Sequence, residues 1–232
     1  MDDKNQIDLI ISLYSKGKSK EALNLLDGLV LNNPKDAVLY NIRGACHAQL
    51  GKPMIAIKQY NQALALDPNY SQAYINLGIT LEEIGELEKA LENFVKAFSL
   101  KPENIETANN ISSILTEINN PVISIDSYKK ILECSPELYL AHFNLGISYQ
   151  ELNLFDEAIS SYKKVLKLYP EFVDAYLNLG LLYEDYGMQD EALMIFERAY
   201  EINPDNPVIL NNLGITLKSL DRIDDAIKSF EK

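Results

Sequence analysis

Residues 71–104 are SQAYINLGITLEEIGELEKALENFVKAFSLKPEN, and variants of this 34-residue pattern fill the chain. Its proline belongs to a series spaced 34 residues apart: Pro34, Pro68, Pro102, Pro136, Pro170 and Pro204. A fixed period of this length is typical of stacked helical hairpins, none of which can bury its apolar face alone. We therefore predict an all-α solenoid of antiparallel helix pairs. It forms a single array with repeats at residues 3–36, 37–70, 71–104, 105–138, 139–172, 173–206 and, incomplete, 207–232.

Three positions of the repeat, numbered from 1 to 34, carry nearly constant side-chain sizes. Position 8 is glycine in five repeats, and position 20 is alanine in all repeats but one. Position 24 is large: Leu26, Tyr60, Phe94, Tyr128, Tyr162, Phe196 and Phe230. Glycine inside a helix costs roughly 1 kcal/mol relative to alanine, so its recurrence indicates a close crossing of two helices. Glycine, asparagine or aspartate at position 15 and proline at position 32 are expected to end the first and the second helix.

The chain is acidic, with a formal net charge of −13. Nucleic acid is therefore excluded as a partner, because phosphate binding needs a concentrated basic face. No apolar stretch is long enough to cross a membrane, and the first residues lack a secretion signal, so we expect no membrane contact and a cytoplasmic location. Cys46 and Cys134 occupy different repeat positions and are interpreted as packing residues of a reducing compartment.

One side of the first helix of each repeat is not needed to close the hairpin. At roughly 100° per residue, positions 4, 7, 8 and 11 cluster on one side, and positions 2, 5, 6, 9, 12 and 13 lie nearly opposite. We call this second set the inner face, and we expect it to line the concave side of the array. Position 6 of the inner face is asparagine in five consecutive repeats: Asn76, Asn110, Asn144, Asn178 and Asn212.

These five residues, called the asparagine ladder below, suggest a mode of binding. An amide offers one acceptor and two donors, so it can pair with any peptide unit without selecting a side chain. The hypothesis is that the ladder grips the main chain of an extended segment; the alternative is a solubilising residue inherited with the repeat. Five amides at a net 0.5–1.5 kcal/mol each give roughly 2.5–7.5 kcal/mol, less than the roughly 8 kcal/mol of a micromolar complex. Apolar anchors must supply the rest, and the candidates are Ile75, Ile79, Phe143, Ile147, Leu177, Leu181 and Ile215.

Acidic side chains lie at position 13 of the inner face: Glu83, Glu117, Glu151 and Asp185. From the second repeat to the sixth, no lysine or arginine occupies an inner-face position. Such a face repels acidic tails and favours a neutral or basic extended segment as partner. The alternative interpretation is a set of ordinary solvated acids, because isolated exposed charges contribute little.

The sequence offers no candidate catalytic centre. His47 and His142 fall on the packing side of their helices, where we interpret them as core residues with satisfied hydrogen bonds. No zinc-ligand spacing, phosphate-binding loop or nucleophile arrangement is present. We expect no catalysis by this chain, no metal and no cofactor.

The repeat resembles the tetratricopeptide repeat over nearly the whole chain. The resemblance is carried by Tyr74, Leu77, Gly78, Leu81, Gly85, Ala90, Phe94, Ala97 and Pro102 and their equivalents. It implies a right-handed superhelix whose concave face binds peptides or whole proteins. The Asn-Leu-Gly triplet is similar to the repeat array of O-GlcNAc transferases, which implies that the asparagine ladder contacts the backbone of a bound polypeptide. The basic clamp of the chaperone-adaptor branch is missing here.

We therefore predict a non-catalytic scaffold that binds a protein or a peptide. Bacterial chains of this appearance often place such an array ahead of a transferase domain. The alternative implied by that resemblance is the substrate-recognition arm of a glycosyltransferase- or sulfotransferase-like enzyme whose catalytic domain lies beyond Lys232.

Repeat 105–138 departs from the pattern within its helices. It has Ala108 in place of the aromatic residue, Ser112 in place of glycine and Ser124 in place of alanine. We expect it to be the softest joint of the array, because these changes remove packing volume or close contact.

The last repeat stops at Lys232, which is position 26. Ile223, Ile227 and Phe230 would normally lie beneath a further repeat, because terminal repeats need a polar outer face. The sequence therefore indicates a fragment of a longer reading frame, and the alternative is end-to-end self-association through this open C-terminal face.

Overall fold

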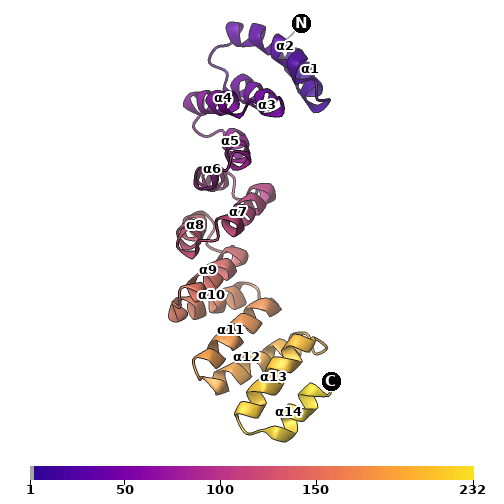
Figure 1. Ribbon diagram of the computed structural model, residues 1–232, viewed down its shortest axis with the longest axis vertical. Coiled ribbons are helices and arrows are strands. Elements are labelled where there is room, and N and C mark those ends of the chain that lie inside the picture. Colours follow the sequence, from indigo (N-terminus) through magenta and orange to yellow (C-terminus); the bar gives the residue numbers. More distant parts are fainter. Residues whose placement is uncertain (1–2) are drawn as a thin grey trace. The chain divides into compact units, whose positions relative to one another are not determined.

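The computed structural model describes residues 3–232 of the chain and folds them into helical hairpins (Figure 1). Within these residues it has fourteen α-helices and no strand. The helices are α1 Asp3–Ser15, α2 Ser19–Asn32, α3 Ala37–Gln49, α4 Pro53–Leu66, α5 Ser71–Glu83, α6 Leu87–Leu100, α7 Ile105–Ile118, α8 Pro121–Cys134, α9 Tyr139–Glu151, α10 Phe155–Leu168, α11 Val173–Asp185, α12 Gln189–Ile202, α13 Pro207–Ser219 and α14 Ile223–Phe230. From α3 onward, the first helix of each repeat begins at the residue that the 34-residue period predicts. The all-α solenoid of helix pairs is confirmed.

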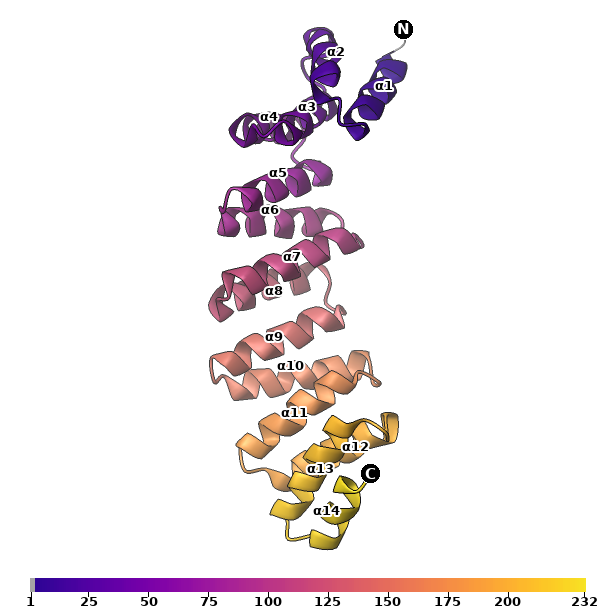
Figure 2. The ribbon, with the colours of Figure 1, turned by 45° about the vertical axis from the view of Figure 1, so that its right-hand side comes forward.

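The helices divide into two compact units, which meet in sequence between Asn120 and Pro121. Unit 1 holds α1 to α7, and its hairpins follow one another in the order of the sequence (Figure 2). Unit 2 holds α8 to α14 and repeats the same arrangement. The division falls inside repeat 105–138, and the expectation that this repeat is the softest joint stays a prediction.

The helices of one hairpin cross closely at positions 8 and 24. A Cβ atom added to Gly78 would lie 2.6 Å from Cε1 of Phe94, closer than real side chains approach. The same contact joins Gly44 to Tyr60 in the preceding repeat. Phe94 is fully buried and Tyr60 is 2% exposed, so the ring fills the space that the glycine leaves open. This confirms the predicted close crossing and explains why the repeat keeps a residue that weakens its helix.

Position 15 ends the first helix as predicted. Gly85 has φ +80° and Asn119 has φ +48°, both in the left-handed region. Glycine enters this region without steric cost, and asparagine tolerates it better than most residues. The chain can therefore reverse direction within a few residues and start the second helix.

A polar contact fastens the first helix of a repeat to the turn before it. The hydroxyl of Tyr40 donates to the carbonyl oxygen of Pro34 at 3.2 Å, and Tyr176 makes the same bond to Pro170 at 2.9 Å. At the equivalent position, Nε2 of His142 lies 2.9 Å from the Pro136 carbonyl oxygen. His142 therefore has a hydrogen-bond partner, as expected, but it is half-buried and not a core residue. His47 is also half-buried, and its Nδ1 is buried without a hydrogen-bond partner among residues 3–232, so its interpretation as a satisfied core residue is wrong.

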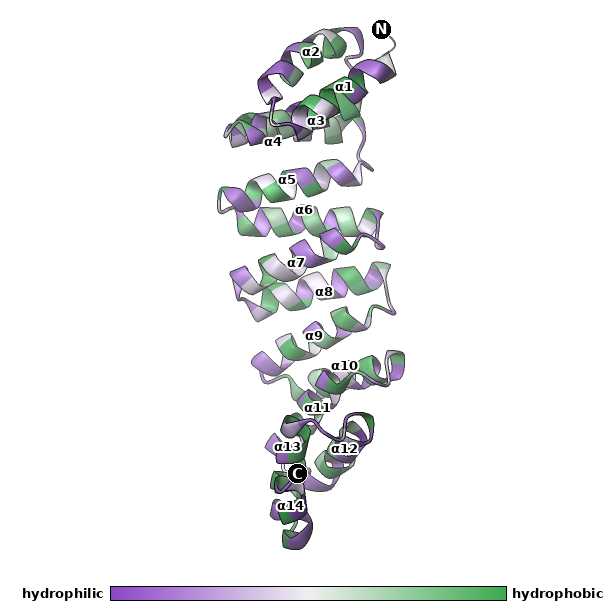
Figure 3. Ribbon diagram, turned by 90° about the vertical axis from the view of Figure 1, so that its right-hand side faces the viewer, coloured by the Kyte–Doolittle hydropathy of each residue, from purple (hydrophilic) through white to green (hydrophobic). Residues whose placement is uncertain are grey.

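Hydrophobic and hydrophilic residues alternate along the helices, as expected when one face of each helix is buried (Figure 3). The fully buried side chains include Leu26 in α2, Phe94 in α6, Tyr162 in α10 and Phe196 in α12. These residues all occupy position 24. The core of each unit therefore runs between the two helices of its hairpins, and the inner face is left to the first helices.

Candidate functional site

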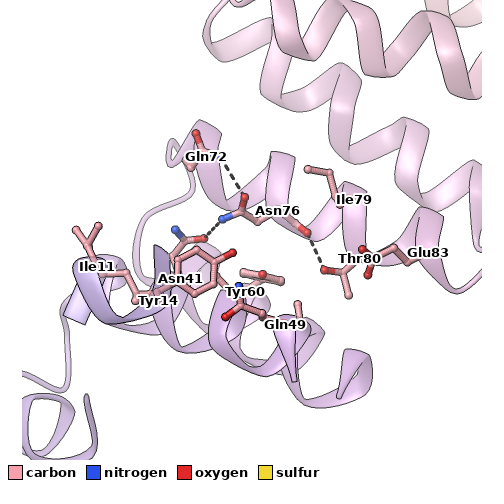
Figure 4. Close-up of a pocket in the computed structure, with 13 residues that line it drawn as sticks. Ile11, Tyr14, Asn41, Gln49, Tyr60, Gln72, Asn76, Ile79, Thr80 and Glu83 are labelled. Atoms are coloured by element: carbon pink, nitrogen blue, oxygen red, sulfur yellow. Dashed lines mark hydrogen bonds between the residues drawn. The ribbon is translucent and has the colours of Figure 1, made fainter. Parts of the chain in front are cut away.

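A hollow of about 510 Å³ opens on the inner face of unit 1, between the first helices of three successive repeats. Helices α1, α3 and α5 supply most of its lining, and Tyr60 reaches it from α4 (Figure 4). Except for Tyr60 and Thr80, every lining residue occupies one of the six inner-face positions. The residues that the helical period sets apart in the sequence are thus gathered around one cavity.

The amides of this hollow bond to one another. Nε2 of Gln72 donates to Oδ1 of Asn76 at 3.1 Å, and Nδ2 of Asn76 donates to Oδ1 of Asn41 at 2.9 Å (Figure 4). Nδ2 of Asn41 donates in turn to the Tyr70 hydroxyl at 3.2 Å. Asn76 is therefore oriented from both sides, by Gln72 and by Asn41. The ladder residue is a member of a network rather than a free amide.

Tyr60 brings a hydroxyl to the hollow from the second helix. Its side chain is 2% exposed, and burial raises the pKa of the phenol well above its usual value, against a smaller opposing effect of a hydrogen bond with Thr80. The phenol is therefore neutral and can both donate and accept. At the same repeat position Phe94 packs against Gly78 with no hydroxyl, so the oxygen of Tyr60 is not needed for the helix crossing.

The remaining predicted residues of unit 1 are Asn110, Glu117 and Glu83, of which Glu83 lines the hollow. Asn110 is half-buried, and its Nδ2 is buried without a hydrogen-bond partner among residues 3–232. Glu83 and Glu117 are exposed. Burial raises the pKa of the Glu82 carboxyl, and the charges of Glu117 and Glu83 raise it further. These three carboxyl groups are therefore close enough to influence one another, and one of them, Glu83, lines the hollow.

Unit 2 carries a related arrangement around Tyr162. Its hydroxyl donates to Oε1 of Gln150 at 3.0 Å and accepts from Nδ2 of Asn178 at 3.5 Å. Burial, with a smaller contribution from the charge of Glu151, raises the pKa of Tyr162 to about 12. Asn144 and Asn178 are both half-buried, so each keeps part of its amide accessible.

Asn212 corrects the expectation of five solvent-facing amides. Asn212 is buried, with 8% of its surface exposed. The first helices α11 and α13 touch each other directly, and Thr216 on α13 donates to the Glu184 carboxylate of α11 at 2.6 Å. Asp185, one residue beyond Glu184, is exposed as predicted.

The predicted apolar anchors differ in how much surface they offer. Leu181 and Ile215 are 39% and 46% exposed. The half-buried anchors are Ile79, Phe143, Ile147 and Leu177. Ile75 was expected to serve as an anchor, and this is wrong: it is 1% exposed, since position 5 of α5 packs into the core of unit 1.

Phe143 belongs to a group of aromatic rings in unit 2. Its ring centroid lies 5.0 Å from that of Phe172, edge to face, and 5.9 Å from that of Tyr162. Tyr139 packs against Phe172 at 5.3 Å. These contacts hold Phe143 in one orientation, with part of its surface accessible.

Family models of the tetratricopeptide repeat match the chain at residues 37–70, at 59–92 and 195–228, and at 143–207. Together these matches cover more than half of the sequence. The chain belongs to the tetratricopeptide repeat family. Proteins of this family are typically protein-binding scaffolds.

Individual relatives resemble this tetratricopeptide chain over part of their length. Tetratricopeptide repeat protein 16 of Mus musculus is 33% identical over 78 residues, which are 34% of this chain and 10% of that protein. The Hsp70-Hsp90 organizing protein of Triticum aestivum is 30% identical over 66 residues, 28% of this chain and 11% of that protein. This chain thus spans about a tenth of the curated relatives it matches.

A solved structure shares the tetratricopeptide fold. In the structure of Naa15/Naa10 bound to HypK-THB, the matching chain has a TM-score of 0.69 and 18% sequence identity. The match covers 100% of this chain and 36% of that one. At this identity the likeness concerns the fold alone. Along residues 3–232, no helix combines the length and apolar character that a membrane crossing requires.

Sequence reasoning missed several lining residues of the tetratricopeptide hollow. Tyr14 and Gln72 occupy inner-face positions whose residue type differs between repeats, so they gave no recurring signal. Gln49 is at position 13, where the recurring residue is acidic and glutamine is an exception. Tyr60 belongs to a packing position, where tyrosine and phenylalanine appear equivalent. The sequence does contain one sign of this role. Position 24 is tyrosine in some repeats and phenylalanine in others, and a hydroxyl that packing does not need indicates a second role for the tyrosines.

Proposed function

We propose that this tetratricopeptide array is a binding scaffold in which the inner face of each unit holds an extended protein segment. The observation that supports this most is the hollow of unit 1, where amides and apolar side chains share one open surface. Asn76 would pair with the main chain, and Ile79 would cover apolar side chains of the ligand. The same surface would also serve if the array were the substrate-recognition arm of a longer enzyme. That the enzyme is a transferase stays a prediction.

The five residues of the asparagine ladder differ in how much surface they can offer to a ligand. Asn76, Asn144 and Asn178 are half-buried, so each presents part of an amide to a ligand. Asn110 has a buried N–H with no partner in the described chain, and because this atom is closed to solvent it reaches a ligand only after a local movement. Asn212 contributes least, because it is buried.

The sign of the charge defines the class of partner. The exposed carboxylates of position 13 follow the inner face in both units: Glu83, Glu117, Glu151 and Asp185. An acidic segment would be repelled, and a neutral or basic one would be accepted. The proposed partner is therefore an extended neutral or basic stretch of protein, and not nucleic acid.

The double variant Asn144→Ala plus Asn178→Ala tests the ladder. Two amides at a net 0.5–1.5 kcal/mol each predict binding that is weaker by roughly 5- to 150-fold. The melting temperature should stay nearly unchanged, because alanine is the better helix former and the bond from Asn178 to Tyr162 is long, at 3.5 Å. The measurement is the affinity of the full chain for peptides selected from an array of random dodecapeptides.

The matched control is Asn61→Ala plus Asn93→Ala. Asn61 is exposed and Asn93 is half-buried, and both lie on second helices, α4 and α6, away from the inner face. This control should leave every peptide affinity within about twofold. Selected peptides that bind the ladder variant as tightly as the unaltered chain would remove the ladder from the mechanism.

Self-association through α14 is a second proposal, supported by its exposed apolar residues. Ile223, Ile227 and Phe230 are 47%, 48% and 49% exposed on one helix. Covering them against another copy would stabilise a complex. We expect sedimentation velocity to show association that grows with protein concentration and is reduced in Ile227→Lys. A chain that stays monomeric at high concentration rules this contact out.

A further inference from the structure

The hollow of unit 1 has an unbalanced charge. Glu83 is the only charged residue among those that line it, and its carboxylate is exposed. Tyr14, Asn41, Gln49, Gln72 and the other polar lining residues are neutral. A ligand that enters this space meets one negative charge and no positive charge from the lining. A cation is therefore the complement, because nothing in the lining neutralises Glu83.

The walls of the hollow suit a long side chain with an aliphatic stem. Ile11 of α1 is 48% exposed, and Ala45 and Ala48 of α3 and Ile79 of α5 are half-buried. Lysine and arginine lay their methylene stems on such apolar surface while the charged head stays in a polar environment. A volume of about 510 Å³ falls within the roughly 300–1,000 Å³ of ligand pockets, enough for one such side chain with its main-chain flanks.

Nearby carboxylates add to the attraction. The pKa of the Glu82 carboxyl is raised by burial and then by the charges of Glu117 and Glu83, so these acids repel one another in the free protein. A bound cation would relieve this repulsion and return the pKa of Glu82 toward its usual value. Binding of a positive head group is thereby linked to the charge state of a group outside the hollow.

The hydroxyl of Tyr60 supplies a neutral polar end to the cavity. It lies among the lining residues together with Thr80, whose hydroxyl donates to the Asn76 carbonyl oxygen at 2.9 Å. Burial keeps the phenol protonated, so its oxygen lone pairs can accept from an ammonium or guanidinium group. Since Phe94 fills the equivalent place in the next repeat, this oxygen is free of a packing role.

We propose that the hollow between α1, α3 and α5 receives a lysine or arginine side chain of the bound segment. The stem lies on Ile11, Ala45 and Ile79, and the charged head meets Glu83 and the Tyr60 hydroxyl. Asn76 pairs with the main chain on either side. This inference rests on the proposed function and gives it specificity: unit 1 selects a basic residue at one place in an otherwise main-chain-bound segment.

The test uses the full chain and peptides selected on it from an array of random dodecapeptides. Each selected lysine is replaced by norleucine, and each arginine by citrulline, which keeps the stem and removes the charge. We expect the critical replacement to weaken binding by about fivefold at 0.15 M salt, and Glu83→Gln to do the same. The two changes together should weaken binding no more than either alone, because they remove the same contact.

Two further variants separate charge from structure. Glu88→Gln removes an exposed carboxylate at the start of α6, outside the hollow, and should change affinity by less than about 1.5-fold. Tyr60→Phe keeps the ring against Gly44 and removes only the hydroxyl. It should weaken the binding of the basic peptides by about twofold. Melting curves of all variants should overlay that of the unaltered chain.

The outcomes test the basic-residue pocket separately from the proposed scaffold function on which it rests. Selected peptides without enrichment in lysine or arginine, or peptides whose affinity is unchanged by Glu83→Gln, would overturn the basic-residue pocket. In that case the asparagine variant still decides whether the inner face binds peptides. An array on which no peptide binds would overturn both the scaffold function and the pocket.

Discussion

Gly180→Leu is expected to unfold the α11–α12 hairpin. A Cβ atom at position 180 would lie 2.5 Å from Cε1 and Cζ of Phe196, a ring that is fully buried. Overpacking a core costs about 1–3 kcal/mol and sometimes more, and leucine adds further carbons to a space that Cβ alone cannot enter. Leucine gains up to about 1 kcal/mol of helix propensity over glycine, so we expect a net loss of about 1–2 kcal/mol.

Guanidinium denaturation followed by circular dichroism measures this loss, as an earlier and broader transition of the full chain. Gly28→Ala is the matched control. Gly28 lies inside α2, and nothing approaches within 4 Å of an added Cβ atom, so alanine should raise stability by roughly 0.5–1 kcal/mol. An unchanged transition for Gly180→Leu would show that the ring can move aside, and the account of position 8 would then be wrong.

The contact between Gly180 and Phe196 shows why the fold could be predicted from the sequence. The two residues lie within one hairpin, and their pairing depends only on helix lengths and a short turn. The same pairing recurs in Gly78 with Phe94 and in Gly146 with Tyr162. A contact that is local in sequence and repeated along the chain leaves a periodic signal. The helix starts and turns are predictable for the same reason.

The state of the asparagine ladder could not be predicted in this way. Whether Asn76 is free depends on how closely α3 and α5 approach, because only then does its Nδ2 reach Asn41 in the previous repeat. Asn212, at the same repeat position, is buried instead. Position 6 is identical in these repeats, yet the side chains differ in exposure and partners. The distance between two repeats depends on the packing of many side chains at once. The residue type at one repeat position therefore does not determine it.

The position of the Tyr60 hydroxyl could not be predicted for a different reason. Position 24 is defined by the buried ring, and a ring with or without oxygen satisfies the helix crossing equally well. Only the cavity shows that the oxygen of Tyr60 reaches the inner face, and only the bonds from Asn178 and to Gln150 show the same for Tyr162. A conserved packing role therefore masked a polar role of the same residue.

Phe196→Ala should destabilise unit 2 much more than Phe230→Ala. Both rings occupy position 24 and both lie against a glycine of the first helix, Gly180 and Gly214. Phe196 is fully buried and belongs to the cluster of Leu179, Leu213 and Leu217, whereas Phe230 is 49% exposed. Removing a buried phenylalanine costs about 3–5 kcal/mol, as lost transfer free energy and as a cavity.

The smaller loss expected for Phe230→Ala follows from its surroundings. About half of its apolar surface already meets water, and a truncated side chain at an exposed site leaves no closed cavity, so roughly 1–2 kcal/mol is expected. Guanidinium denaturation at low protein concentration compares the two variants without self-association. Equal losses would contradict this account, because a ring that is 49% exposed would then contribute as much to stability as a fully buried one.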